Sequence, residues 1–160
     1  MQSAWSIYED AARKVLADIR QVLGISNVEG KQSLDGARGT SWELYAKAWC
    51  EGSNGFLVIE VRRHTSAGLM QEDLEAISYR IRDVGGAGGI VVSPLLMQKG
   101  AQIIAASSGI SHVRLSPERT TETYLAEFMG RRFLGVSIIE SARATDSCGA
   151  QVSRGAPNGS

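Results

Sequence analysis

Charged side chains at the end of one apolar stretch have the types and spacing that could hold a cation and an anion. In FLVIEVRR (56–63), Glu60 and Arg62 follow four apolar residues. Side chains alternate along a strand, so Glu60 and Arg62 point to one face and Val61 points to the other. A carboxylate can ligate a divalent cation, and a guanidinium can hold a phosphate group.

The preceding stretch WELYAKAW (42–49) carries a second alternating set of polar residues. Glu43, Tyr45 and Lys47 share one face, and the turn EGSNG predicts a hairpin that brings this face near Glu60. The exact pairing is left open by the sequence. Because a buried charge costs free energy without a partner, the alternative is an ordinary salt bridge from Glu60 to Arg62 or Lys47.

The elements that must position these residues follow from the periodicity of apolar residues. Their order predicts an α/β fold with a mixed central sheet flanked by helices, starting with an antiparallel meander and ending with a β-α-β-α unit. The predicted helices are 8–23, 69–84, 100–107 and 117–131, and the predicted strands are 25–30, 42–49, 56–61, 89–94 and 112–115. We expect one domain over residues 4–135, with a polar loop at 31–41, and a disordered tail at 141–160.

Composition limits the function classes. A chain of 160 residues predicts one domain, and 17 basic residues balance 17 acidic ones. Zero net charge counts against clamping long stretches of phosphate backbone, although it leaves room for a local basic patch. No apolar run approaches the ~20 residues of a membrane span, so we expect no membrane partner. The start MQSAWSIYED lacks the parts of a signal peptide, and we expect a cytoplasmic location.

From about Tyr8 to Leu115 the chain resembles the Mrr-type restriction endonuclease domain of the PD-(D/E)xK nuclease superfamily. The resemblance is carried by local phrases and by the order of the elements, and no single motif is diagnostic. The phrases are YEDAARKVLADI, GTSWELYAKA, FLVIEVRR, MQEDLEAISYRIRDVGGAGG, GIVVSP, KGAQIIAASSGI and HVRL.

The resemblance implies a restriction-endonuclease-like three-layer sandwich and a Mg²⁺ ion held by two carboxylates and a backbone carbonyl. Such a metal acidifies the attacking water and neutralises charge on the phosphate. Glu60 matches the second acid, the Val61 carbonyl the backbone ligand and Arg62 the lysine. Tyr45 falls on the first acid.

Two of these positions depart from the family pattern. Tyrosine supplies no negative charge at neutral pH because its ordinary pKa is ~10. Arginine stays protonated and can hold a phosphate, but its guanidinium group is not interchangeable with the compact ammonium of a lysine that positions the attacking water. We expect Glu43 or Glu9 to replace the missing acid, and Lys47 or Arg62 to contact the phosphate. Gln71 is a further polar candidate that would assist them.

The sequence therefore predicts a metal-dependent DNA endonuclease of the Mrr type, with the alternatives of an intact or an altered or degraded active site left open. DNA is the expected partner, with a homodimer left open. The alternative is a non-catalytic DNA- or protein-binding module that retains the nuclease fold. A third alternative is an interaction domain that binds no nucleic acid, which the zero net charge favours.

Overall fold

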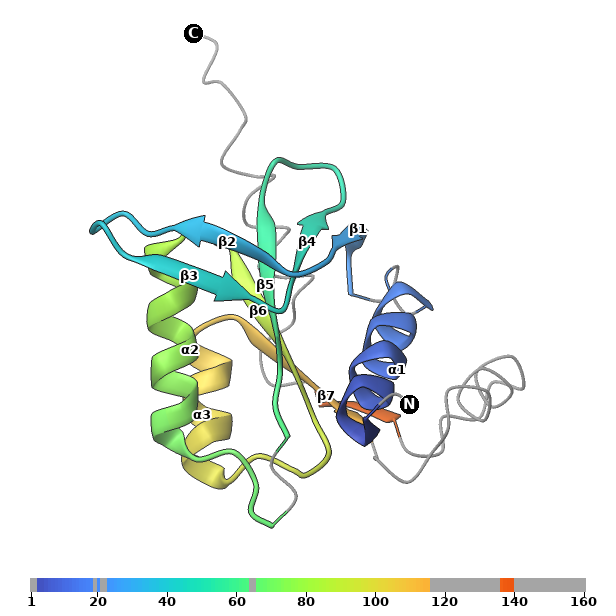
Figure 1. Cartoon of the computed structure of the whole chain (residues 1–160). Coiled ribbons are helices and arrows are strands. Elements are labelled where there is room, and N and C mark those ends of the chain that lie inside the picture. The colour runs from blue at the N-terminus through green and yellow to red at the C-terminus, as the bar shows by residue number, and fades with distance from the viewer. Residues whose placement is uncertain (1–2, 19, 21–22, 64–65, 116–135, 140–160) are drawn as a thin grey trace, which may run out of the picture.

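The protein, represented by a computed structural model, is a three-layer α/β sandwich (Figure 1). The structure describes residues 3–18, 20, 23–63, 66–115 and 136–139. The predicted helix after Pro117 and the predicted tail 141–160 lie outside the described residues. The elements are α1 (Ala4–Asp18), β1 (Ile25–Glu29), β2 (Gln32–Asp35), β3 (Ser41–Leu44), β4 (Ala46–Cys50), β5 (Phe56–Val61), α2 (Gln71–Asp83), β6 (Gly88–Ser93), α3 (Lys99–Ser107), β7 (Ile110–Leu115) and β8 (Val136–Ile139).

The central sheet has the strand order β1-β4-β5-β6-β7-β8. Strands β1, β4 and β5 are antiparallel neighbours, β5, β6 and β7 are parallel, and β8 is antiparallel to β7. The predicted mixed sheet is therefore confirmed, with an antiparallel meander followed by parallel strands. No described helix is long and apolar enough to cross a membrane.

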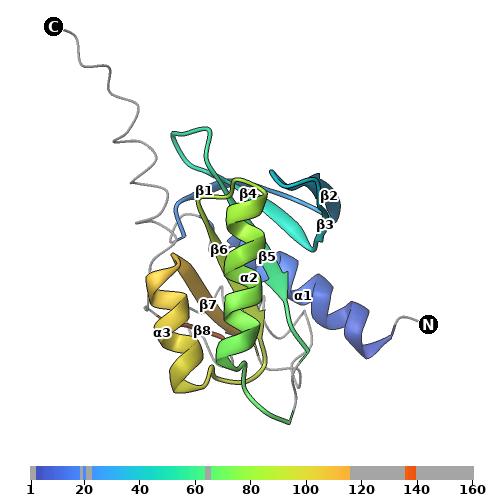
Figure 2. The same cartoon turned by 90° about the vertical axis from the view of Figure 1, so that its left-hand side faces the viewer.

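The helices cover opposite faces of the sheet. α1 packs against one face through a core that includes Leu16, Leu57 and Ile90. α2 and α3 lie side by side on the other face (Figure 2), over a core that includes Val58 and Val91. The alternation of side chains along β5 and β6 thus divides the apolar residues between two cores, as expected for strands buried on both sides.

The segment predicted as one strand at 42–49 is instead two strands that belong to different sheets. β3 pairs with β2, a strand that the sequence analysis assigned to a loop, and β4 pairs with β1 and β5. Tyr45 lies at the break between them. The two-stranded β2–β3 sheet lies over the end of α2 (Figure 1) and contributes Leu34, Trp42 and Leu44 to the α2 side of the core.

Candidate functional site

Glu60 lies near the end of β5 in an ion-pair cluster with two arginines. Its side chain is 9% exposed, and one carboxylate oxygen accepts a hydrogen bond from Nη1 of Arg80 on α2. The other oxygen lies 4.0 Å from Nε of Arg62. The predicted Glu60–Arg62 pair is therefore present, and the sequence analysis missed Arg80, which forms the closer contact.

Arg80 reaches Glu60 because it lies at the edge of the buried face of α2. Ile77 and Ile81 on this face are buried against the sheet, and Arg80 is beside them. Its guanidinium carbon lies 5.1 Å from the centre of the Trp42 ring, so an aromatic face from β3 covers the cation. Arg80 is thus held between a carboxylate and an indole.

Tyr45 and Glu9 lie together on the opposite side of the sheet. The Tyr45 hydroxyl donates a hydrogen bond to the Glu9 backbone carbonyl at 2.6 Å, and its ring packs against the α1 core. Burial raises the pKa of Tyr45, so the phenol stays neutral and cannot act as the missing acid. The Glu9 carboxylate lies 3.5 Å from the Lys31 ammonium.

The prediction that Tyr45 and Lys47 share a face is wrong, because the break at Tyr45 interrupts the alternation. Lys47 lies on the α2 side, with Nζ 4.0 Å from the Trp49 ring centre and 4.4 Å from that of Phe56. Lys47 pairs with Val58, and Phe56 lies on the side of Val58 away from Glu60. Lys47 therefore points away from Glu60, and no salt bridge joins them among the described residues.

Within the described chain, neither Glu43 nor Gln71 is hydrogen-bonded or ion-paired to Glu60. Glu43 is exposed on β3, and its neighbours Trp42 and Leu44 pack toward α2, so Glu43 faces the other way. Gln71 begins α2, nine residues before Arg80 and thus about 14 Å along the axis. Its amide donates to Glu75.

The expected metal ligands do not fit a Mg²⁺ site. Glu60 is ion-paired on the α2 side of the sheet, Glu9 lies on the α1 side, and Glu43 is exposed on β3. Val61 pairs with Val92 at the end of β5, and the described chain holds no group of three or more His, Cys, Asp or Glu side chains that could bind a metal ion. A divalent cation at Glu60 would have to displace two guanidinium groups that already neutralise the carboxylate.

A second buried carboxylate, Asp83, lies at the end of α2 below the β2–β3 turn. Thr40 Oγ1 donates a hydrogen bond to Asp83, and Trp42 Nε1 donates a second at 2.8 Å. The Ala37 backbone N–H also donates to the Asp83 carbonyl at 2.8 Å. The hydrogen bonds from Thr40 and Trp42 lower the pKa of Asp83, which therefore stays ionised.

Gly36 permits this close approach of the turn to α2. A Cβ atom at Gly36 would collide with the Asp83 carboxylate and with Thr40 Oγ1. The turn also contains Gly39 at φ +80°, a conformation that favours glycine. The two glycines fix the turn against the last residues of α2.

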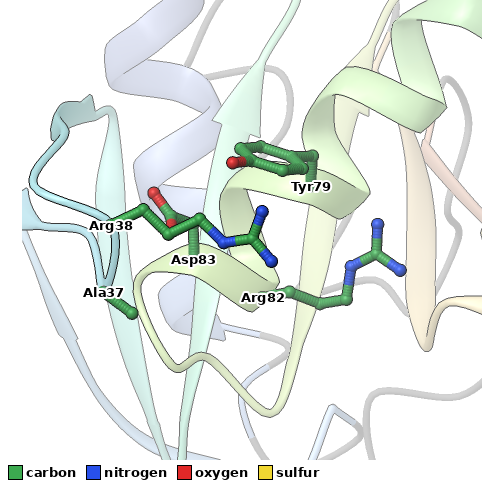
Figure 3. A pocket seen from close by; sticks show the side chains of 5 residues that line it. All are labelled: Ala37, Arg38, Tyr79, Arg82 and Asp83. Carbon is green, nitrogen blue, oxygen red and sulfur yellow. The ribbon is translucent and has the colours of Figure 1, made fainter.

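Beside Asp83 the turn and α2 enclose a hollow of about 460 Å³. Figure 3 shows Arg38 reaching from the turn across α2, with Tyr79 beside it and Arg82 further along. Both arginines are exposed, and within the described chain neither guanidinium has a hydrogen-bonded or ion-paired partner. The hollow is lined by Ala37, Arg38, Tyr79, Arg82 and Asp83.

Ser93 and His112 form a buried polar pair that the sequence analysis missed. Ser93 Oγ lies 2.6 Å from His112 Nε2 and donates its single proton to the Leu95 carbonyl at 3.0 Å. With the hydroxyl proton on the Leu95 carbonyl, the tautomer of His112 that carries its proton on Nε2 completes the hydrogen bond to Ser93 Oγ. Burial lowers the pKa of His112 to about 4, and the arrangement is a neutral hydrogen bond inside the core.

Of the contacts made by Glu60 and Asp83, only those of Glu60 could be predicted from the sequence. Glu60 inside an apolar strand requires a partner, and Arg80, at the edge of the apolar stripe of the helix 69–84, could have been chosen. The contacts of Asp83 with Thr40 and Trp42 span about forty residues, and no local pattern indicates them.

The fold and the positions of these residues define an α/β three-layer sandwich with an ion-paired carboxylate at the end of a central strand. Among solved structures, it is similar to the crystal structure of a protein of unknown function, AF1548, with a TM-score of 0.57 and 18% sequence identity. The match covers 78% of this chain and 67% of that chain, and this likeness shows the fold alone. No protein-family model matches the chain. No curated protein matches it either.

Proposed function

We propose that this protein is a DNA-binding module of restriction-endonuclease-like ancestry that does not hydrolyse DNA. The observation that carries the proposal is the state of Glu60, whose carboxylate contacts Arg80 and Arg62. A Mg²⁺ site needs carboxylate oxygens that are free to coordinate the ion. Here the carboxylate instead neutralises two arginines.

The position of the other acids supports the same proposal. The residue that aligns with the first acid, Tyr45, is a neutral phenol that faces α1, and Glu9 is paired with Lys31. Neither supplies the second negative charge that metal-dependent hydrolysis of a phosphodiester requires. The nuclease prediction from the sequence would need a rearrangement of both faces of the sheet.

DNA as the partner rests on the resemblance and on exposed arginines. Arg63 follows β5 and is exposed, and Arg82 at the C-terminal end of α2 and Arg38 in the neighbouring turn are also exposed. With zero net charge, local groups of arginines are the means by which this chain would contact phosphates.

The test combines cleavage and binding. Supercoiled plasmid is incubated with wild type and Glu60→Ala in Mg²⁺ and in Mn²⁺, and binding to a DNA duplex is measured over a range of salt concentrations. We expect no cleavage by either protein, and binding that strengthens as salt falls. Cleavage by wild type that is absent in Glu60→Ala, under conditions in which circular dichroism shows the variant to be folded, would establish the nuclease instead. Absence of binding at low salt would remove DNA as the partner.

A further inference from the structure

We propose that the hollow between the β2–β3 turn and the last turns of α2 binds a nucleotide unit, with its phosphate held by Arg38 and Arg82 and its base packed on Tyr79. This inference goes beyond the proposed function, because it assigns a ligand class to a site other than the Glu60 cluster. The nucleotide can be free or part of a nucleic-acid strand, and both sources offer the same chemistry.

The charge of the hollow favours an anion. Arg38 and Arg82 bring two positive charges to its wall, and Asp83 brings one negative charge. The Asp83 carboxylate is already hydrogen-bonded by Thr40 and Trp42. The charge of Arg38 also stabilises this carboxylate, but in the described chain neither guanidinium group forms a hydrogen bond or an ion pair with it. Planar guanidinium groups bind phosphate oxygens through paired hydrogen bonds.

The aromatic wall favours a ligand with a flat ring in addition to the phosphate. Tyr79 is 38% exposed, and its ring lines the hollow (Figure 3). Trp42 packs against Tyr79 edge to face, with 6.2 Å between the ring centres. An exposed aromatic face next to arginines is the arrangement with which proteins bind unstacked bases.

The size and rigidity of the hollow fit one nucleotide. Its volume of about 460 Å³ lies within the range of small-molecule sites, about 300–1,000 Å³. Hydrogen bonds from the turn to Asp83, together with the missing Cβ of Gly36, hold Arg38 over α2. The turn is thus positioned before any ligand binds, which lowers the entropy cost of binding.

The experiment measures binding of adenosine monophosphate, adenosine and inorganic phosphate to the whole chain by calorimetry. A labelled single-stranded oligonucleotide of about twelve nucleotides and its duplex, a length chosen to exceed a typical single-strand site size, are measured by fluorescence anisotropy. The variants are Arg38→Gln, Arg82→Gln and Tyr79→Leu, all at exposed positions, and each is checked for wild-type thermal unfolding. Arg20→Gln, an exposed arginine after α1 on the opposite side of the sheet, is the matched control.

We expect adenosine monophosphate to bind at least about tenfold more tightly than phosphate or adenosine alone, because both subsites contribute. Arg38→Gln and Arg82→Gln should each weaken its binding about tenfold, and Arg20→Gln should change it less than twofold. Tyr79→Leu should weaken binding of adenosine monophosphate and leave phosphate binding unchanged. Equal binding of phosphate and adenosine monophosphate, or wild-type affinity in both arginine variants, would overturn the proposal.

The oligonucleotide measurements distinguish this proposal from the proposed function. If the strand or duplex binds wild type and both arginine variants equally, and both variants also bind adenosine monophosphate as wild type does, DNA binding stands and the nucleotide site is refuted. If adenosine monophosphate binds in the expected manner and no nucleic acid binds at low salt, the site stands for a free nucleotide and the DNA-binding function is refuted. A single strand that competes with adenosine monophosphate supports both.

Discussion

Glu60 and Asp83 are both buried carboxylates beside α2, and their partners differ in charge. Glu60 contacts the guanidinium groups of Arg80 and Arg62, so two cations are used inside the protein. Asp83 is hydrogen-bonded by the neutral donors of Thr40 and Trp42. A carboxylate that is satisfied by neutral donors leaves neighbouring arginines available to external anions, whereas one satisfied by arginines does not.

The contrast is sharpest between Arg80 and Arg82, two residues apart on α2. Arg80 is 20% exposed and is paired with Glu60 beneath the Trp42 ring. Arg82 is exposed and lines the hollow. One arginine therefore stabilises the fold, and the other is free for binding.

The largest effect should follow from breaking the Glu60 cluster. Glu60→Ala removes the carboxylate and leaves two half-buried arginines without their partner. Loss of one member of a buried pair costs about 3–5 kcal/mol, and exposure of the arginines places this case near 3 kcal/mol. Chemical denaturation measures the change. Glu43→Ala, at an exposed position on β3, is the matched control and should change the free energy of unfolding by less than about 0.5 kcal/mol. Equal effects of the two substitutions would contradict the prediction that the ion pairs of Glu60 stabilise the fold.

A smaller difference in the free energy of unfolding should be seen between substitutions of Arg80 and of Arg82 on α2. Arg80→Met should lower the free energy of unfolding by about 2 kcal/mol, because Arg62 still neutralises part of the Glu60 charge. Arg82→Met should change it by less than about 0.5 kcal/mol, as expected for an exposed side chain. In the double variant Glu60→Ala/Arg80→Met, the two losses should be less than additive, since the residues contact each other. Additive losses would show that Arg80 acts independently of Glu60.

The smallest effect should be seen in the pH dependence of Asp83. The pKa of Asp83 in the folded protein lies below its ordinary value of 3.8, chiefly because Thr40 and Trp42 donate to the carboxylate. Its ionised form therefore contributes stability above pH 3.8, and this contribution is lost as pH falls through the folded-state pKa. Wild type should have a larger free energy of unfolding than Asp83→Asn at neutral pH, and this difference should disappear in acid. A difference that is constant with pH would exclude this linkage.

The order and type of most elements could be predicted from the sequence because their apolar periods are strong. The stretches 56–61 and 69–84 correspond to β5 and α2 within two residues at each end. The strand β2 was missed because QSLD is short and polar, and its pairing with β3 depends on the turn chemistry of residues 36–40. Tertiary contacts with α2 stabilise this hairpin.

The candidate site was less predictable than the fold. Alternation placed Glu60 and Arg62 together, which is observed, but it also grouped Tyr45 with Lys47. A single irregular residue between two strands reverses the facing of all residues before it. For Arg80 the sequence offered only an indirect signal, its place at the edge of the apolar stripe of α2. The side-chain contacts of Asp83 join segments about forty residues apart, and a one-dimensional pattern contains no information on them.

The break at Tyr45 has a consequence for how this protein could diversify. Glu29 and Lys47 are paired across β1 and β4, so the chain leaves the central sheet and returns to it at adjacent points. The intervening β2–β3 hairpin is an insertion whose two ends lie next to each other. Such insertions accept changes of length and sequence without altering the register of the flanking strands. The exposed tip of this hairpin, which carries Arg38, can therefore vary in sequence, while Leu34, Trp42 and Leu44 keep the hairpin packed on the α2 side of the core.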